Sequence, residues 1–137
     1  MGNMKKSVVI LAYLRHDNHL LLLKRSSNAP SFPDHWSVVS GHVEESDADS
    51  LIAAVREVFE ETGITADNLR LVNRLEPFEV VMSDRSRVVH SFLFDVLTKD
   101  VSLNSEHADF AWIDHKSLKD FSCVEGVDTV WKMLHNG

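Results

Sequence analysis

The chain has 137 residues, of which 44% are hydrophobic and 26% are charged, with 14 Lys plus Arg against 21 Asp plus Glu. This length fits a single domain spanning residues 1–137, and the composition is that of a globular protein with a packed core. It excludes disordered and disulfide-scaffold chains. The net charge of −7 argues against a surface that grips a nucleic acid polymer, because acidic groups repel the phosphate backbone.

Neither a membrane-spanning segment nor a secretion signal is expected. The apolar run from Val8 to Leu14 is too short to cross a bilayer and ends in polar residues. Cys123 is the single cysteine, so it forms no internal disulfide, which fits a reducing compartment. We therefore expect a cytoplasmic protein that does not contact membranes.

The first part of the chain predicts short strands. Two apolar runs flank the Asp17-Asn18 pair, whose residues tolerate turn geometry, and this pattern predicts a hairpin. A stretch rich in Asn, Pro and Asp then predicts a loop before a third short strand. The predicted strands are residues 7–14, 20–24 and 36–39, with the loop at 26–35.

Residues 48–62 predict an amphipathic helix. Apolar residues recur there three and four positions apart, which is the spacing of one helix face. They are Leu51, Ala54, Val55, Val58 and Phe59. Gly63 ends the helix, and either Ser46 or Asp47 is expected to cap its first amides.

The second half of the chain predicts a long hairpin, a last strand and a closing helix. The hairpin strands are rich in β-branched and apolar residues and flank a polar connector. In chain order, the elements are strands 69–81 and 88–97 around the connector 83–86, a strand at 110–113 and a helix at 124–134.

Three glutamates on the predicted helix 48–62 carry the clearest chemical signal. Glu57, Glu60 and Glu61 stand at i, i+3 and i+4, so their carboxylates project from one side of the helix, opposite much of its apolar stripe. Like charges at this spacing repel by a few tenths of a kcal/mol per pair, roughly, unless cations neutralise them. Such a face is either simply solvated or a metal site.

The segment from Gly41 through Arg56 to Ile64 resembles the Nudix box, in which a glycine and a glutamate precede Arg-Glu-U-x-Glu-Glu-x-Gly-U, with U an aliphatic residue. Its second half matches at every specified position. The resemblance extends to the strand ending at Arg25, to His35-Trp36 and to the segment 106–112, which looks like the acidic segment before a late strand. The first half of the box departs from the pattern, because its loop is one residue longer.

This departure places Ala48 where the box has its first glutamate and His42 where it has a glycine, and Asp47 is the nearest replacement for the glutamate. Asp47 is either a helix cap or a substitute in the metal site. We expect the capping role, because its side chain is shorter than that of glutamate and the loop is shifted.

The resemblance implies an α/β fold, an α/β/α sandwich with a mixed β-sheet. It also implies Mg²⁺- or Mn²⁺-dependent hydrolysis of a small molecule, a nucleoside diphosphate linked to a further moiety. An ordinary or oxidised (d)NTP, cut to the monophosphate and pyrophosphate as in the MutT-like branch, is the first expectation. Nucleotide sugars, ADP-ribose and dinucleoside polyphosphates are alternatives, as is a non-catalytic nucleotide-sensing or protein-interaction domain; a homodimer is left open.

The resemblance also assigns roles to residues of this chain. Glu57, Glu60 and Glu61 are implied as metal ligands, joined by the Ser40 carbonyl, and Glu57 also as a candidate base. Two arginines have supporting roles: Arg56 orients the catalytic carboxylates and Arg25 meets substrate phosphate. Gly41 allows close approach of substrate, and Glu106 either completes the metal site or acts as the base.

Overall fold

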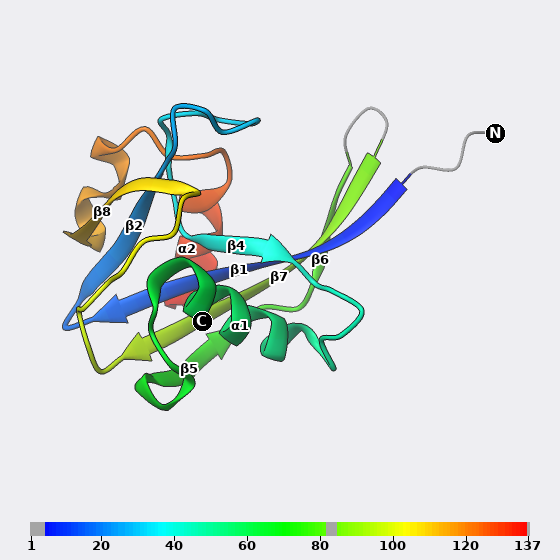
Figure 1. Cartoon of the computed structure of the whole chain (residues 1–137), viewed down its shortest axis with the longest axis horizontal. Helices are drawn as coiled ribbons and strands as arrows, with labels where there is room; N and C mark the ends of the chain where they lie inside the picture. Colours follow the sequence, from blue (N-terminus) through cyan, green and yellow to red (C-terminus); the bar gives the residue numbers. More distant parts are fainter. Residues whose placement is uncertain (1–4, 82–84, 137) are drawn as a thin grey trace.

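The computed structural model describes residues 5–81 and 85–136, which form a mixed eight-stranded sheet between two helices (Figure 1). The main strand order is β3-β2-β1-β7-β5, and β4, β6 and β8 pair with β1, β7 and β2, respectively. The strands are β1 Lys5–His16, β2 His19–Arg25, β3 Trp36–Ser37, β4 Val39–His42, β5 Leu69–Arg74, β6 Phe78–Val81, β7 Arg85–Val96 and β8 His107–Asp114. The central pair β1–β7 is parallel and the other named pairs are antiparallel. The predicted mixed α/β sandwich is therefore confirmed.

One helix covers each face of the sheet. Helix α1 (Ser50–Thr62) packs with Ile10, Ala12 and Leu14 of β1, while α2 (Val127–Asn136) packs on the face that carries Tyr13. Successive strand residues point to opposite faces, so β1 contributes to both cores. Two short 3₁₀ helices, η1 (Ala66–Asn68) and η2 (His115–Asp120), complete the described elements. No helix within the described ranges is long and apolar enough to span a bilayer.

The first hairpin and its turn are confirmed. β1 and β2 pair antiparallel, and Asp17 and Asn18 adopt φ angles of 48° and 67° between them. Both residues occupy the left-handed region, which Asn and Asp tolerate better than most side chains.

The start of α1 differs from the prediction. The helix begins at Ser50, and its cap is Asp49, whose side chain accepts a hydrogen bond from the Ile52 amide at 2.8 Å. The expected caps Ser46 and Asp47 are therefore wrong. Phe59, predicted on the apolar face, is 55% exposed, because 3.6 residues per turn place it roughly 80° from Leu51, at the edge of that face.

Several strand and helix bounds also differ from their predictions. The predicted strand 36–39 is divided between β3 and the start of β4, because the chain changes its pairing partner there from β2 to β1. The predicted strand 69–81 breaks at residues 75–77, where Pro77 lacks an amide for the ladder. Helix α2 starts at Val127 and not at the predicted residue 124. The residues before it pair with β3 instead: Cys123 forms an isolated β-bridge with Trp36, and the Val124 amide donates to the Trp36 carbonyl. Of the predicted connector 83–86, residues 83 and 84 lie outside the described residues, and residues 85 and 86 belong to β7.

Candidate functional site

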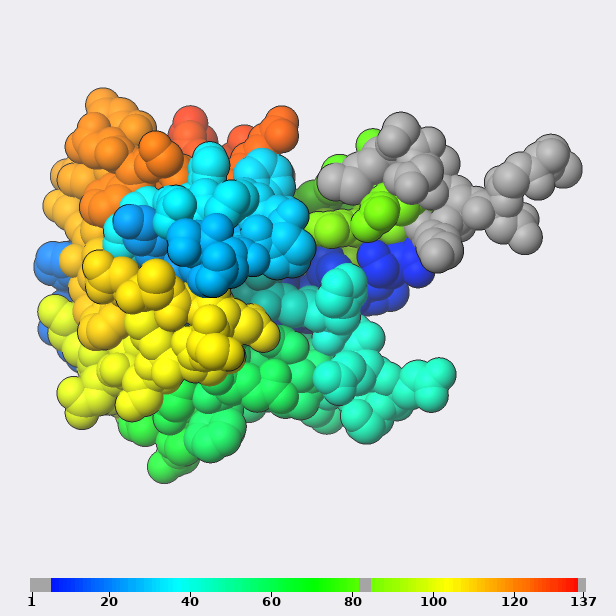
Figure 2. Space-filling model, turned by 45° about the horizontal axis from the view of Figure 1, so that its top comes forward, coloured from blue at the N-terminus to red at the C-terminus, as the bar shows by residue number. Residues whose placement is uncertain are grey.

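A groove of about 1080 Å³ crosses the molecule between α1, β4, β6, β7 and the segment before α2. Figure 2 shows the surface hollowed where the loop 26–35 approaches the strands. One part of the groove is acidic, with Glu57, Glu61 and Glu106, and another part is apolar, with Phe78 and Val89. The acidic part contains most of the residues that the sequence singled out.

Glu61 lies at the bottom of this acidic part. Its side chain follows Ala54 and Val58 along α1 at i+7 and i+3, so it faces inward with the apolar stripe. It is 1% exposed, and neither carboxylate oxygen has a hydrogen-bond partner within the described residues. The prediction that all three glutamates project away from the stripe is therefore wrong for Glu61.

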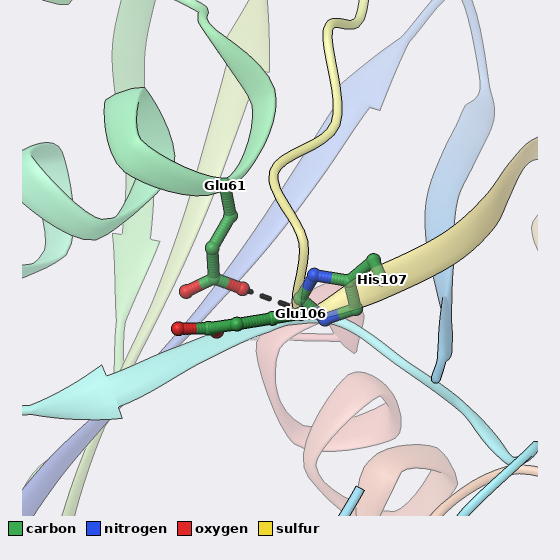
Figure 3. Close-up of side chains that lie close together, drawn as sticks. All are labelled: Glu61, Glu106 and His107. Carbon is green, nitrogen blue, oxygen red and sulfur yellow. Dashed lines mark ion pairs between the residues drawn. The ribbon is translucent and has the colours of Figure 1, made fainter. Parts of the chain in front are cut away.

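Glu61, Glu106 and His107 offer ligand atoms that all lie within 4.8 Å of one another. Figure 3 shows Glu61 reaching from α1 toward Glu106 and His107, at the start of β8. His107 Nε2 lies 3.7 Å from Glu61 Oε1. Burial, with a contribution from Arg25, lowers the pKa of His107 to about 4, so the imidazole is neutral near pH 7 and able to ligate a metal.

His107 was missed in the sequence-based prediction. It adjoins Glu106, but it belongs to no motif with the spacing of known metal ligands. A single histidine in an acidic segment does not by itself indicate a metal site. The burial that makes it part of the cluster comes from β8 pairing with β2, which brings His107 opposite Arg25.

The carboxylates of the cluster repel one another. Burial raises the pKa of Glu61, and the neighbouring Glu57 and Glu106 carboxylates raise it further, while the Ser40 backbone offsets part of the rise. An ionised carboxylate without partners is costly to bury, so this arrangement suits a bound cation. The donor set of carboxylates, with an imidazole beside them, is compatible with Mg²⁺ or Mn²⁺.

Gly41 lies directly beneath Glu57. A Cβ added at Gly41 would overlap the Glu57 carboxylate. The absence of a side chain thus leaves room for a charged group against the β4 backbone. Here the approaching group is Glu57; contact with substrate stays a prediction.

Arg56 lies outside the groove lining and binds carboxylates from that side. Its guanidinium donates to Asp47 from Nε at 3.0 Å and from Nη2 at 2.8 Å, and Nη1 donates to Glu57 Oε1 at 2.9 Å. These acceptors raise the pKa of Arg56 further above its usual range. Nη2 also donates to the His42 carbonyl at 3.0 Å, so Arg56 ties the lengthened loop to α1. An orienting role needs such contacts, and the role itself stays a prediction.

Asp47 is thus a partner of Arg56, not a helix cap, and its carboxylate also accepts from the Glu44 amide at 2.8 Å. The preferred capping role is wrong because Asp49 occupies that position. The extra loop residue is absorbed before α1 and brings Asp47 against the guanidinium.

Two predicted site residues differ from the others in position: Glu60 lies outside the groove, and Arg25 lies beside the buried cluster, opposite His107. Glu60 receives a hydrogen bond from Arg56 at 3.2 Å, and its side chain is 49% exposed, outside the groove lining. Arg25 lies on the groove wall and donates from Nε to the Ser31 carbonyl at 2.8 Å. The structure therefore gathers Ser40, Gly41, Glu57, Glu61 and Glu106, with Arg25 alongside.

Asp47→Asn is expected to lower the melting temperature by several degrees at neutral pH, because Arg56 loses a bidentate carboxylate. The control Asp49→Asn should be nearly silent, since Asn caps as well as Asp. Pairing with Arg56 lowers the pKa of Asp47, so the effect is present above about pH 4 and vanishes as the pH falls through that lowered value. An unchanged melting temperature with a higher Mg²⁺ requirement would instead place Asp47 among the metal ligands.

Comparison with known proteins agrees with this site. The NUDIX domain family model matches residues 4–130. This chain belongs to the Nudix family. It is a hydrolase of the class that cleaves pyrophosphate linkages in nucleotide derivatives, and Nudix hydrolases act on small nucleotide substrates with a divalent metal ion.

Three similar proteins illustrate the range of this Nudix chain's relatives. It is 30% identical to the dihydroneopterin triphosphate diphosphatase of Haemophilus influenzae, covering 96% of this chain and 88% of that protein. It is 25% identical to the nucleoside triphosphatase NudI of Klebsiella pneumoniae, covering 86% and 89%. A crystal structure of a MutT protein from Methanosarcina mazei Go1 superimposes with a TM-score of 0.78 at 21% identity, over 99% and 97%.

Proposed function

We propose that this Nudix hydrolase converts a (d)NTP, an oxidised (d)NTP or a closely related triphosphate into the monophosphate and pyrophosphate, with Mg²⁺ or Mn²⁺ as cofactor. The observation that carries the proposal is the buried Glu61, whose carboxylate oxygens have no hydrogen-bond partner in the described part of the chain and face other carboxylates at the bottom of an open groove. Carboxylates alone would repel a polyphosphate, whereas carboxylates holding a divalent cation attract one.

Glu57, Glu61 and Glu106 would hold the cation, with the Ser40 carbonyl and His107 nearby, and Glu60 would join them from the rim. The fit rests on the unpaired Glu61 oxygens and on the space that Gly41 leaves for the Glu57 carboxylate. When bound, the cation supplies neutralisation of phosphate charge and Lewis-acid polarisation of the phosphorus centre.

The chain's own residues then have separate tasks. Arg25 lies on the groove wall, where its guanidinium can donate two parallel hydrogen bonds to a phosphate. Arg56 holds the Glu57 carboxylate in place from outside the groove. Glu57 or Glu106 accepts the proton of the attacking water at a carboxylate oxygen, and both carboxylates line the groove.

The relatives support a triphosphate substrate. Two of them are named for triphosphates, one of a nucleoside and one of dihydroneopterin. The 30% identity to the Haemophilus influenzae protein favours dihydroneopterin triphosphate as a second candidate substrate. The net charge of −7 supports a small molecule rather than a nucleic acid polymer.

Turnover of these triphosphates is expected to require added Mg²⁺ or Mn²⁺, to stop with excess chelator and to release pyrophosphate rather than orthophosphate. A panel of (d)NTPs, 8-oxo-dGTP, dihydroneopterin triphosphate, ADP-ribose, a nucleotide sugar and a dinucleoside polyphosphate, at fixed Mg²⁺, measures this by product chromatography.

Several outcomes would contradict the proposal. Turnover that persists in excess chelator would overturn the metal assignment, and a clear preference for ADP-ribose or a nucleotide sugar would overturn the triphosphate assignment. Binding without turnover of any compound would favour the non-catalytic alternative.

A further inference from the structure

One arginine of the groove has neither a hydrogen-bond partner nor an ion pair among the residues that the structure describes. Arg87 of β7 lines the groove, is half-buried, and has a buried Nε atom that finds no hydrogen-bond acceptor among the described residues. No ion pair of Arg87 occurs within ranges 5–81 and 85–136, although five glutamates, Glu57 and Glu61 among them, also line the groove. Burying part of a guanidinium without an acceptor costs free energy, so its position suits a ligand that supplies acceptors.

Arg87 lies beside the aromatic part of the groove. It pairs with Val80 across β6, while Phe78 pairs with Val89 two residues further along β7. Residues two apart on a strand share one face, so Arg87 and Phe78 are diagonal neighbours on the same surface. Both line the groove, together with Val89. The aromatic ring therefore offers a flat apolar surface with a guanidinium at its margin.

The strand register separates Arg87 from the acidic cluster. Val9 pairs with His42 of β4 on one side and with Val89 of β7 on the other. Two strand spacings put β4 and β7 roughly 10 Å apart, and Arg87 lies two residues beyond Val89, roughly 7 Å further along the strand. A ligand whose phosphates meet the acidic cluster, next to Gly41 and Glu57, would thus present its other end to Arg87.

We propose that Arg87 is the base-recognising residue of this enzyme and selects a base with two adjacent acceptors on one edge. Such edges are the carbonyl and ring nitrogen of a 6-oxopurine or of a 4-oxopteridine, which match the paired donors of a guanidinium. Adenine has an amino donor beside its ring nitrogen. It can therefore accept only one hydrogen bond from Arg87, and its amino group faces a guanidinium N–H, donor against donor. This inference rests on the proposed triphosphate function and names the base within it.

Equilibrium binding of non-hydrolysable GTP and ATP analogues, measured by calorimetry with Mg²⁺, tests the assignment. Wild-type protein is expected to bind the GTP analogue at least about tenfold more tightly than the ATP analogue, the size of one good bidentate contact. In Arg87→Gln this ratio falls to one or below, because a glutamine amide matches the adenine edge rather than the guanine edge. Arg87→Lys keeps the charge but lacks the paired donors of a guanidinium, and it should lose most of the preference.

Two controls separate base recognition from charge. Arg70→Gln removes an exposed positive charge of β5 outside the groove lining and should leave the ratio unchanged. Inorganic tripolyphosphate should bind wild-type protein and Arg87→Gln equally. Melting temperatures identify any unfolded variant, and Arg87→Lys carries the comparison if Arg87→Gln does not fold.

Three results would overturn the inference: no preference of wild-type protein for the GTP analogue, an unchanged ratio in both Arg87 variants, or an equal loss of tripolyphosphate binding. The last result would assign Arg87 to phosphate. Because binding is measured without turnover, an enzyme that binds the GTP analogue selectively but hydrolyses no triphosphate would refute the proposed function and leave the role of Arg87 standing.

Discussion

Glu61→Gln is expected to lower kcat about 100-fold or more while raising the melting temperature of the metal-free protein. The loss of rate follows because a neutral amide is a poor ligand for a hard cation, whose contribution is several kcal/mol, roughly a hundredfold or more in rate. The gain in stability follows because Glu61 is 1% exposed, faces other carboxylates and has no hydrogen-bond partner within residues 5–81 and 85–136. Because its pKa is raised, this carboxyl takes up a proton when the metal-free protein folds near neutral pH, and the glutamine variant avoids that cost.

The pH dependence of this effect has a defined sign. Burial raises the pKa of Glu61 in the folded protein above its unfolded value. Wild-type protein therefore keeps its full stability below about pH 4.3 and loses part of it as the pH rises toward the folded pKa, whereas the glutamine variant does not. In metal-free buffer, the difference in melting temperature between Glu61→Gln and wild-type protein should therefore increase as the pH rises over this range.

Melts with and without Mg²⁺ measure both effects. Mg²⁺ should raise the melting temperature of wild-type protein and have little effect on Glu61→Gln. Glu45→Gln, an exposed residue of the loop before α1, is the control for loss of one carboxylate. A Glu61→Gln variant with near wild-type turnover, or one less stable than wild-type protein without metal, would show that Glu61 is structural.

The elements of the fold follow largely from local sequence, but their arrangement does not. The spacing of Leu51, Ala54 and Val58 predicts α1, and Asp17-Asn18 predicts the first turn, because both signals lie within a few residues. The parallel ladder from Lys5 and Arg85 to Arg15 and Asp95 joins segments 80 residues apart. No periodicity reports such a contact, and the mixed sheet was expected from family resemblance.

The residues of the site were likewise predicted from local sequence, but their arrangement was not. The i, i+3 and i+4 spacing identifies the glutamates, but Glu60 and Glu61 differ by one residue, about 100° around the helix. One is half-exposed beside Arg56, and the other is buried beside His107. Which carboxylate faces inward depends on how α1 rests on the sheet, and the partner of Asp47 depends on the path of a lengthened loop. Neither is encoded in spacing alone.

Gly41→Ala is expected to reduce kcat about 100-fold with little backbone strain. The φ angle of Gly41 lies outside the left-handed region, so alanine is tolerated by the backbone. Its Cβ would overlap the Glu57 carboxylate, which must then leave its position against β4. A displacement of about 1 Å in a catalytic group is enough for such a loss.

A double-mutant cycle with Glu57→Ala separates this clash from any other effect of the methyl group. In the wild-type background the Glu57 carboxylate must move aside and lose its hydrogen bond from Arg56, which should destabilise the protein by about 1–2 kcal/mol. In the Glu57→Ala background the carboxylate is absent, so adding the methyl group should cost almost nothing, and the two substitutions should be strongly non-additive in the free energy of unfolding. Denaturant unfolding of the four proteins measures this coupling without reference to turnover. Equal destabilisation in both backgrounds would mean that Gly41 is required by the strand itself, and the space it leaves for Glu57 would then have no part in building the site.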